Sequence, residues 1–237
     1  MALPKLDHPT LTMKVPSTQQ EVVYRAFIVK EEKILMLAQE DGDPKAIARA
    51  VKQVLNNCII SGDVDIDHLA SFDVDYMFLQ LRARSVGETV DLSIPCEECE
   101  TAIMFEVDLN AVEVKSKGDM PDPNIKLTDT VGIVLRWPEI DDAGDIGAED
   151  KGEIEKAFSL IAACVEQIYD ADNVYSKSDV SLKEIEEWLQ DLTQEQFEKI
   201  RDFFDDMPKV VAETDIKCGK CSHKQKVTIE GMQNFFG

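Results

Sequence analysis

The residues best suited to chemistry are four cysteines arranged as two Cys-x-x-Cys pairs. Cys96 and Cys99 form one pair, and Cys218 and Cys221 form the other. Two thiolates separated by two residues in a tight turn can bind the same metal ion, and Zn²⁺ takes four such ligands in a tetrahedron. One pair supplies half of a site, and two pairs supply a whole one. The pattern therefore predicts a structural zinc site made of Cys96, Cys99, Cys218 and Cys221.

The surroundings of the two pairs support this site and indicate its architecture. Between Cys99 and Cys218 lie 118 residues, which exceeds the usual spacing of a zinc ribbon and is compatible with a subdomain inserted between its halves. The first pair has acidic neighbours and the second has basic ones, Glu97, Glu98 and Glu100 against Lys217, Lys220 and Lys224. Because a zinc ion bound by four thiolates carries about two negative charges, the lysines help to offset them.

Two other interpretations of the cysteine pairs remain open. A thioredoxin-like redox pair needs its Cys-x-x-Cys at a helix N-terminus, where the helix dipole lowers the thiol pKa, whereas strand-like residues follow both pairs here. Reduced cysteines that bind no metal are the second alternative. His223 lies two residues after Cys221 and is either a substitute ligand or a solvated neighbour. Cys58 and Cys164 fall on apolar helix faces and are predicted to be core residues.

The remaining motifs give no support for catalysis. The run Asp170-Ala-Asp172-Asn173 resembles the start of a calcium-binding loop, but its fifth position is Val174 and its twelfth is Ser181 instead of a glutamate, so turn residues are the better interpretation. The sequence has no Gly-rich phosphate loop, no Gly-x-Ser-x-Gly and no His-Glu-x-x-His. We therefore expect a protein that is not an enzyme.

The elements that must position the cysteines are predicted to be β-hairpins. Alternating apolar and polar residues at 89–94 and 102–107 flank the first pair, and similar runs near 210–216 and 225–229 flank the second. Each pair then sits at the tip of a hairpin. We expect residues 88–109 and 209–230 to be the two halves of a zinc-ribbon-like element.

The rest of the chain mixes strands and helices. A hairpin is predicted at 11–15 and 22–28, helices at 30–40, 44–58 and 71–84, and strands at 125–127 and 132–137. The acidic segment 139–150 is expected to be a solvated loop, and residues 152–169 a helix. Capping boxes at Ser181–Glu184 and Thr193–Gln196 predict two further short helices. The sequence thus predicts one α+β domain, residues 1–237, in which 139–208 form a mainly helical insertion.

The composition limits the partners. With 47 acidic and 25 basic residues the formal net charge is −22, which repels nucleic-acid phosphates and favours basic protein partners. No apolar run approaches the roughly 20 residues that span a bilayer, and the N-terminus has no apolar signal-peptide core. We expect a protein of the cytoplasm that contacts neither membrane nor nucleic acid directly.

Three stretches of the chain resemble a known family. They are Met1–Thr10, Phe27–Glu40, and the block from Ile60–Asp63 through Ser71–Ser85. These stretches are similar to the baseplate hub family of T-even-type contractile-tailed phages, and the two cysteine pairs fall where that family's would be expected. The resemblance covers most of the chain, and the first 110 or so residues are the most specific.

The resemblance implies a non-enzymatic role in building the hub of the tail baseplate, as a subunit or as an assembly factor. Its partners would be other phage baseplate hub proteins. It would act in the host cytoplasm during assembly, and a permanent subunit would also lie in the tail baseplate of the virion. The alternative from a different class is a zinc-ribbon adaptor that binds a transcription or replication protein. A redox protein that uses the cysteine pairs is a third class.

Overall fold

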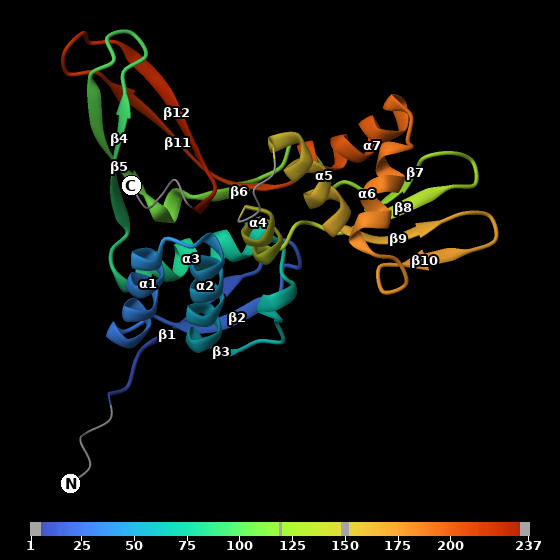
Figure 1. Cartoon of the computed structure of the whole chain (residues 1–237). Coiled ribbons are helices and arrows are strands. Elements are labelled where there is room, and N and C mark those ends of the chain that lie inside the picture. The colour runs from blue at the N-terminus through green and yellow to red at the C-terminus, as the bar shows by residue number, and fades with distance from the viewer. Residues whose placement is uncertain (1–5, 119, 148–151, 233–237) are drawn as a thin grey trace. The chain divides into compact units, whose positions relative to one another are not determined.

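The chain is a mixed α+β protein with several small antiparallel sheets, as the sequence predicted. The computed structural model describes residues 6–118, 120–147 and 152–232. Residue contacts divide the chain into two compact units (Figure 1). Unit 1 contains Met1–Asp41, Arg49–Lys115 and Lys209–Gly237, and unit 2 contains Gly42–Ala48 and Ser116–Pro208. The single domain over residues 1–237, with its insertion at 139–208, stays a prediction.

Unit 1 holds three small sheets, whose orders are β1-β2-β3, β12-β11-β6 and β4-β5. Its strands are β1 (Thr10–Lys14), β2 (Glu21–Arg25), β3 (Ile59–Ser61), β4 (Thr89–Pro95), β5 (Ala102–Asp108), β6 (Glu113–Lys115), β11 (Lys209–Lys217) and β12 (Lys224–Glu230). Its helices are α1 (Val29–Asp41), most of α2 (Pro44–Cys58), α3 (Ser71–Ser85) and the 3-10 turns η1 (Ile66–His68) and η2 (Leu109–Ala111). The predicted first hairpin and the three predicted helices are confirmed.

The core of unit 1 is built around α3. This helix buries apolar side chains on most of its circumference, including Val74, Met77, Phe78 and Leu79. A helix that is apolar on more than one face must be covered by several elements, because a single contact leaves part of it in water. The elements that contact α3 include η2, with its fully buried Leu109, and the strands β6 and β11.

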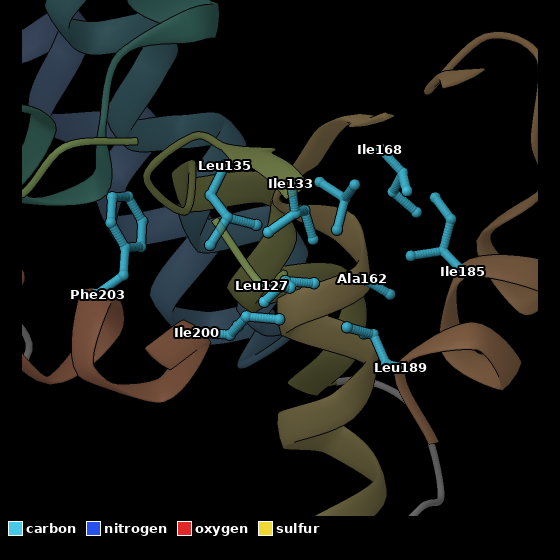
Figure 2. Packing of buried hydrophobic residues seen from close by; sticks show 10 residues of the cluster. Leu127, Ile133, Leu135, Ala162, Ile168, Ile185, Leu189, Ile200 and Phe203 are labelled. Atoms are coloured by element: carbon cyan, nitrogen blue, oxygen red, sulfur yellow. The ribbon is translucent and has the colours of Figure 1, made fainter. Parts of the chain in front are cut away.

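Unit 2 has one four-stranded antiparallel sheet in the order β10-β9-β8-β7. Its elements are β7 (Asn124–Lys126), β8 (Gly132–Leu135), α4 (Ile140–Gly147), α5 (Glu153–Ala163), β9 (Val165–Tyr169), β10 (Val174–Ser176), α6 (Leu182–Gln190) and α7 (Gln194–Asp205). Ile133 and Ile168 from the sheet pack with Ile185, Leu189 and Ile200 from α6 and α7 (Figure 2). Both predicted capping boxes are present at the starts of α6 and α7.

Two local predictions were wrong. Residues 140–147 of the acidic segment form helix α4 instead of a loop, and residues 148–150 lie outside the described part of the chain. The Asp142 carboxylate stabilises the start of α4, because it accepts the N–H of Glu139 (2.8 Å) and binds Arg136 (2.7 Å). The helix predicted at 152–169 ends at Ala163, and residues 165–169 form β9, where Ile168 lies opposite Ile133 of β8.

Candidate metal centre

Two hairpins of unit 1 carry the four cysteines at their tips. β4 and β5 pair from Thr89 opposite Asp108 to Pro95 opposite Ala102, so the loop that contains Cys96 and Cys99 closes directly after the last pair. β11 and β12 pair in the same way up to Lys217 opposite Lys224. The hairpins stand together with their tips at one end (Figure 1). Alternating side chains in the strands explain these elements, because one face of each hairpin is buried.

The two cysteine loops have the same backbone geometry. In the first, Cys96 N–H donates to Thr101 O (2.9 Å) and Glu100 N–H donates to Cys96 O (2.8 Å). In the second, Cys218 N–H donates to His223 O (2.8 Å) and Ser222 N–H donates to Cys218 O (3.0 Å). Glu100 and Ser222, each one residue after the second cysteine, have positive φ angles of 58° and 64°. The repeated turn aims both sulfurs of a pair to the same side.

A third loop adopts this turn without cysteines. Between β1 and β2, Val15 N–H donates to Gln20 O (2.9 Å), Gln19 N–H donates to Val15 O (2.8 Å), and Gln19 has φ 58°. In the second cysteine loop the N–H of Lys220 points at the Cys218 sulfur (3.4 Å). In the third loop the corresponding N–H, that of Ser17, donates to the carboxylate of Asp73. A buried carboxylate thus takes the place of a sulfur acceptor.

Side chains below the loops hold the hairpins together. Cys96, Ile103, Ile216 and Cys218 form a small buried cluster. The buried Gln225 of β12 bridges to the other hairpin: its Oε1 accepts the N–H of Glu97 (3.1 Å), and its Nε2 donates to Pro95 O (3.4 Å). This side chain satisfies backbone groups of the first cysteine loop, which otherwise lose hydrogen bonds on burial.

The four sulfurs form one compact group, as the sequence predicted for a metal site. All four Sγ atoms lie within 4.8 Å of one another, and two approaches cross between the hairpins: Cys96 to Cys221 and Cys99 to Cys218, each 3.6 Å. Zinc–sulfur bonds of about 2.3 Å place the corners of a tetrahedron about 3.8 Å apart. The sulfur–sulfur bond of a disulfide is about 2.05 Å long, so these sulfurs are too far apart for one, and all four cysteines are free. The donor set and spacing therefore fit a tetrahedral metal ion.

The pKa values of the thiols show how crowded negative charge is at this point. The pKa of Cys99 is lowered to about 6 by hydrogen bonds with the Thr101 side chain and backbone, and the pKa of Cys218 is lowered by the backbone N–H groups of Cys221 and Lys220. For Cys221 the N–H of His223 lowers the pKa, but desolvation and the neighbouring sulfurs raise it to about 12. Four thiolates in this space need a cation to offset their charge.

The other residues singled out in the sequence lie away from the sulfur group or beside it. His223 faces Glu97 across the hairpins (3.8 Å). Cys58 and Cys164 are buried, and desolvation raises the pKa of their thiols to about 11 and about 12. Asp170 accepts the backbone N–H groups of Asp172 and Asn173, which makes it a turn residue. No helix starts at either cysteine pair, so the geometry of a thioredoxin-like redox pair is not present.

Sequence reasoning missed the residues that support the site. Gln225 was assigned only to a strand, because its burial between the exposed Lys224 and Lys226 appears only in the structure. Glu100 and Ser222 are not glycines, so nothing in the sequence indicates that they adopt positive φ angles, which only the structure reveals. Glycine is the residue that sequence analysis associates with such positions.

Comparison with known proteins identifies the family. A family described as T4 bacteriophage base plate protein matches residues 8–237. The chain belongs to this family. Among curated proteins, this base plate family member is similar to the baseplate hub assembly protein gp26 of Enterobacteria phage T4, with 25% identity over 213 residues that cover 90% of each chain. No solved structure matches this 237-residue chain.

The family membership agrees with the resemblance described above. The match runs through both halves of the cysteine site and through unit 2. Among the helices of the described residues, none combines the length and the apolar character needed to cross a bilayer. The chain is thus a phage baseplate protein with a group of four cysteines suited to a metal ion.

Proposed function

We propose that this protein is a non-enzymatic component of the phage tail baseplate hub, either a subunit or an assembly factor, and that a structural zinc ion joins its two cysteine hairpins. Its partners are other baseplate hub proteins, which it meets in the host cytoplasm during assembly. The observation that supports the hub role is the family match over residues 8–237. The similar protein from phage T4 is named a baseplate hub assembly protein, and this name narrows the proposal from the baseplate to its hub.

The zinc ion is supported by the donor set. Four cysteine sulfurs within 4.8 Å of one another are a soft, tetrahedral set, which favours Zn²⁺ over hard cations. Cys96, Cys99, Cys218 and Cys221 would hold the ion, and it would supply a cross-link between β4–β5 and β11–β12. Such a link matters because the buried cluster between the hairpins is small. The family match favours this hub role over a zinc-ribbon adaptor for transcription or replication.

Elemental analysis of protein purified without chelator tests the metal. We expect one zinc ion per chain in the wild type, loss of the ion in Cys96→Ser, and retention in Cys164→Ala, which removes a buried thiol of unit 2. Chelator should release four thiols to a thiol reagent, whereas a disulfide would need a reductant. Absence of zinc in the wild type together with an unchanged stability of Cys96→Ser would contradict the metal proposal.

Phage assembly tests the hub role separately. A phage that lacks this protein should accumulate baseplates without a complete hub, and the Cys164→Ala variant supplied in trans should restore plaques. The Cys96→Ser variant should restore far fewer. Normal baseplates in the absence of the protein would contradict the hub role whatever the metal content.

A further inference from the structure

Unit 2 contains an apolar groove that neither the metal site nor the hub assignment uses. It has a volume of about 360 Å³ and lies between the β9–β10 hairpin and α6. Ile168, Val180 and Ile185 provide apolar lining, and two aromatic residues, Tyr175 and Trp188, complete it. All of the lining residues belong to unit 2, so this one unit forms the whole groove.

The aromatic residues come from the two elements on either side of the groove. Tyr175 of β10 lies opposite Ile168 of β9, so both side chains are on the face of the sheet that α6 covers. Trp188 of α6 is only partly buried and packs against the core cluster of unit 2. Tyr175 remains 43% exposed, although it lies on the covered face of the sheet. An exposed aromatic ring beside an apolar groove is a typical contact for a binding partner.

Two carboxylates give the groove a negative rim. Asp170 accepts the Tyr175 hydroxyl (3.2 Å), and Glu184 accepts both the N–H (2.8 Å) and the hydroxyl (2.6 Å) of Ser181. The pKa of Asp170 is lowered mainly by the backbone N–H groups of Asp172 and Asn173, and less by the Tyr175 hydroxyl. The Ser181 hydroxyl and N–H lower the pKa of Glu184, so both acids favour their ionised forms. From Val165 to Asp191 the sequence has eight acidic residues against two basic ones, Lys177 and Lys183. Neither lysine lines the groove.

We propose that this groove binds an arginine side chain from a basic segment of a partner protein. A guanidinium group stacks on aromatic rings, donates to carboxylates and buries its aliphatic stem on apolar surface. The groove offers all three kinds of contact, and the −22 charge of the chain attracts a basic partner from a distance. This inference rests on the proposed hub function, which implies that the partner is a protein. It adds the chemistry by which that partner is recognised.

Peptide binding tests the groove independently of metal and of phage assembly. The probes are two fluorescein-labelled nonapeptides with a Gly/Ser background, one with three arginines and one with three leucines. Fluorescence anisotropy at about 0.15 M salt, where long-range attraction is screened, should show binding of the arginine peptide to the wild-type chain. The leucine peptide should bind at least about tenfold more weakly, because it cannot use the carboxylates.

Matched variants separate the groove from general charge attraction. Glu184→Gln removes a rim charge and keeps the capping box, because Gln196 already fills the equivalent position at the start of α7. Its control is Glu187→Gln, the same charge loss on the same helix outside the groove. We expect Glu184→Gln and Tyr175→Ala each to weaken arginine-peptide binding roughly three- to fivefold. Glu187→Gln and Leu182→Ala, a comparably exposed apolar residue outside the groove, should have little effect.

Three outcomes would overturn the proposal. Equal weakening by Glu184→Gln and Glu187→Gln would mean nonspecific attraction to an acidic surface. Equal binding of the leucine peptide would mean an apolar occupant. No binding of the arginine peptide by the wild-type chain would exclude this occupant. None of these results bears on the hub role, which the assembly experiment decides, so the two proposals fail separately.

Discussion

At the scale of single residues, the cysteine loops carry backbone strain that a sequence motif does not reveal. Glu100 and Ser222 adopt left-handed φ angles of 58° and 64° at equivalent positions. In this region the Cβ atom crowds the following carbonyl oxygen, and only glycine avoids the cost of about 1–2 kcal/mol. The turn that requires these angles brings both sulfurs of each pair to the shared site, and Gln19 has the same φ of 58° in the loop without cysteines.

The substitution Glu100→Gly should therefore increase stability. The free energy gained by relief of the left-handed strain exceeds the entropic cost of ordering a glycine on folding. We expect a gain of about 0.5 kcal/mol in the free energy of unfolding, measured with urea. Glu100→Val should instead lose about 1 kcal/mol, because a β-branched residue fits this region worst. The control Glu98→Gly, in the same loop without a positive φ, should not gain stability. A gain for Glu98→Gly equal to that for Glu100→Gly would refute the strain argument.

A second residue-scale prediction concerns Asp75 of α3. Its carboxylate accepts the N–H of Met232 (3.2 Å), but desolvation raises its pKa to about 6, above the ordinary value near 3.8. Between these two values the folded state binds more protons than the unfolded state, so stability falls as the pH rises through about 6. Asp75→Asn keeps an acceptor and has no charge to desolvate.

Urea unfolding at several pH values checks this sign. The variant and the wild type should be similar near pH 4, and the variant should become more stable by about 2 kcal/mol at pH 7.5. Asp91→Asn, at an exposed position of β4, controls for the loss of one negative charge from an acidic chain. An advantage of Asp75→Asn that does not change with pH would show that burial of the charge is not its origin.

At the scale of elements, the helices of unit 2 depend on their caps. Ser181 Oγ accepts the N–H of Glu184, and Thr193 Oγ1 accepts the N–H of Gln196, each at 3.3 Å. Replacement of either cap by alanine leaves helix N–H groups without their acceptor, and we expect a loss of about 1 kcal/mol per substitution. Thermal unfolding followed by circular dichroism measures the loss. Ser178→Ala, at an exposed position that caps no helix, should change stability by less than about 0.3 kcal/mol.

The same elements show what sequence could predict. Capping boxes, the Asp43-Pro44 helix start and the alternating hairpins at the cysteines are local signals, so the corresponding elements were found. Residues 165–169 were predicted wrongly because Val165, Ile168 and Tyr169 also match helical spacing. Their strand is decided by its place between β8 and β10, which is a tertiary effect. Helix α4 depends in the same way on Arg136, which binds Asp142 through two hydrogen bonds.

The candidate site was predictable for a different reason. Two cysteine pairs make a complete ligand set whatever lies between them, so Cys96, Cys99, Cys218 and Cys221 could be named without knowledge of the fold. The sequence could not assign the 118 intervening residues to one unit or the other, because the alternation within the hairpin strands carries no information about the residues between the hairpins. Gln225, which ties one hairpin to the other through Pro95 and Glu97, is visible only once the strands are paired.

At the scale of the whole molecule, the division into two units predicts a divided response to metal removal. All four cysteines lie in unit 1, whereas the sheet and helices of unit 2 pack around their own apolar core. If the proposed metal ion is bound, the small cluster between the hairpins cannot replace its four bonds, since the cluster contains few apolar side chains. Chelation should therefore loosen the hairpins and leave unit 2 folded.

Amide hydrogen exchange of the full chain, with and without chelator, resolves the two responses. We expect protection to fall at least about tenfold in β4, β5, β11 and β12, and to stay within about twofold in β8, β9 and α6. Cys96→Ser without chelator should reproduce the pattern, and Cys164→Ala should not. Loss of protection throughout the chain would mean that the units fold as one cooperative domain held by the metal. No change in either unit would mean that the hairpins are stable without an ion. The loop between β1 and β2 shows that the same turn can form without cysteines, because there the Asp73 carboxylate accepts the loop's N–H. The exchange pattern therefore decides whether the proposed metal ion is needed to order the hairpins or whether the hairpins are stable without it.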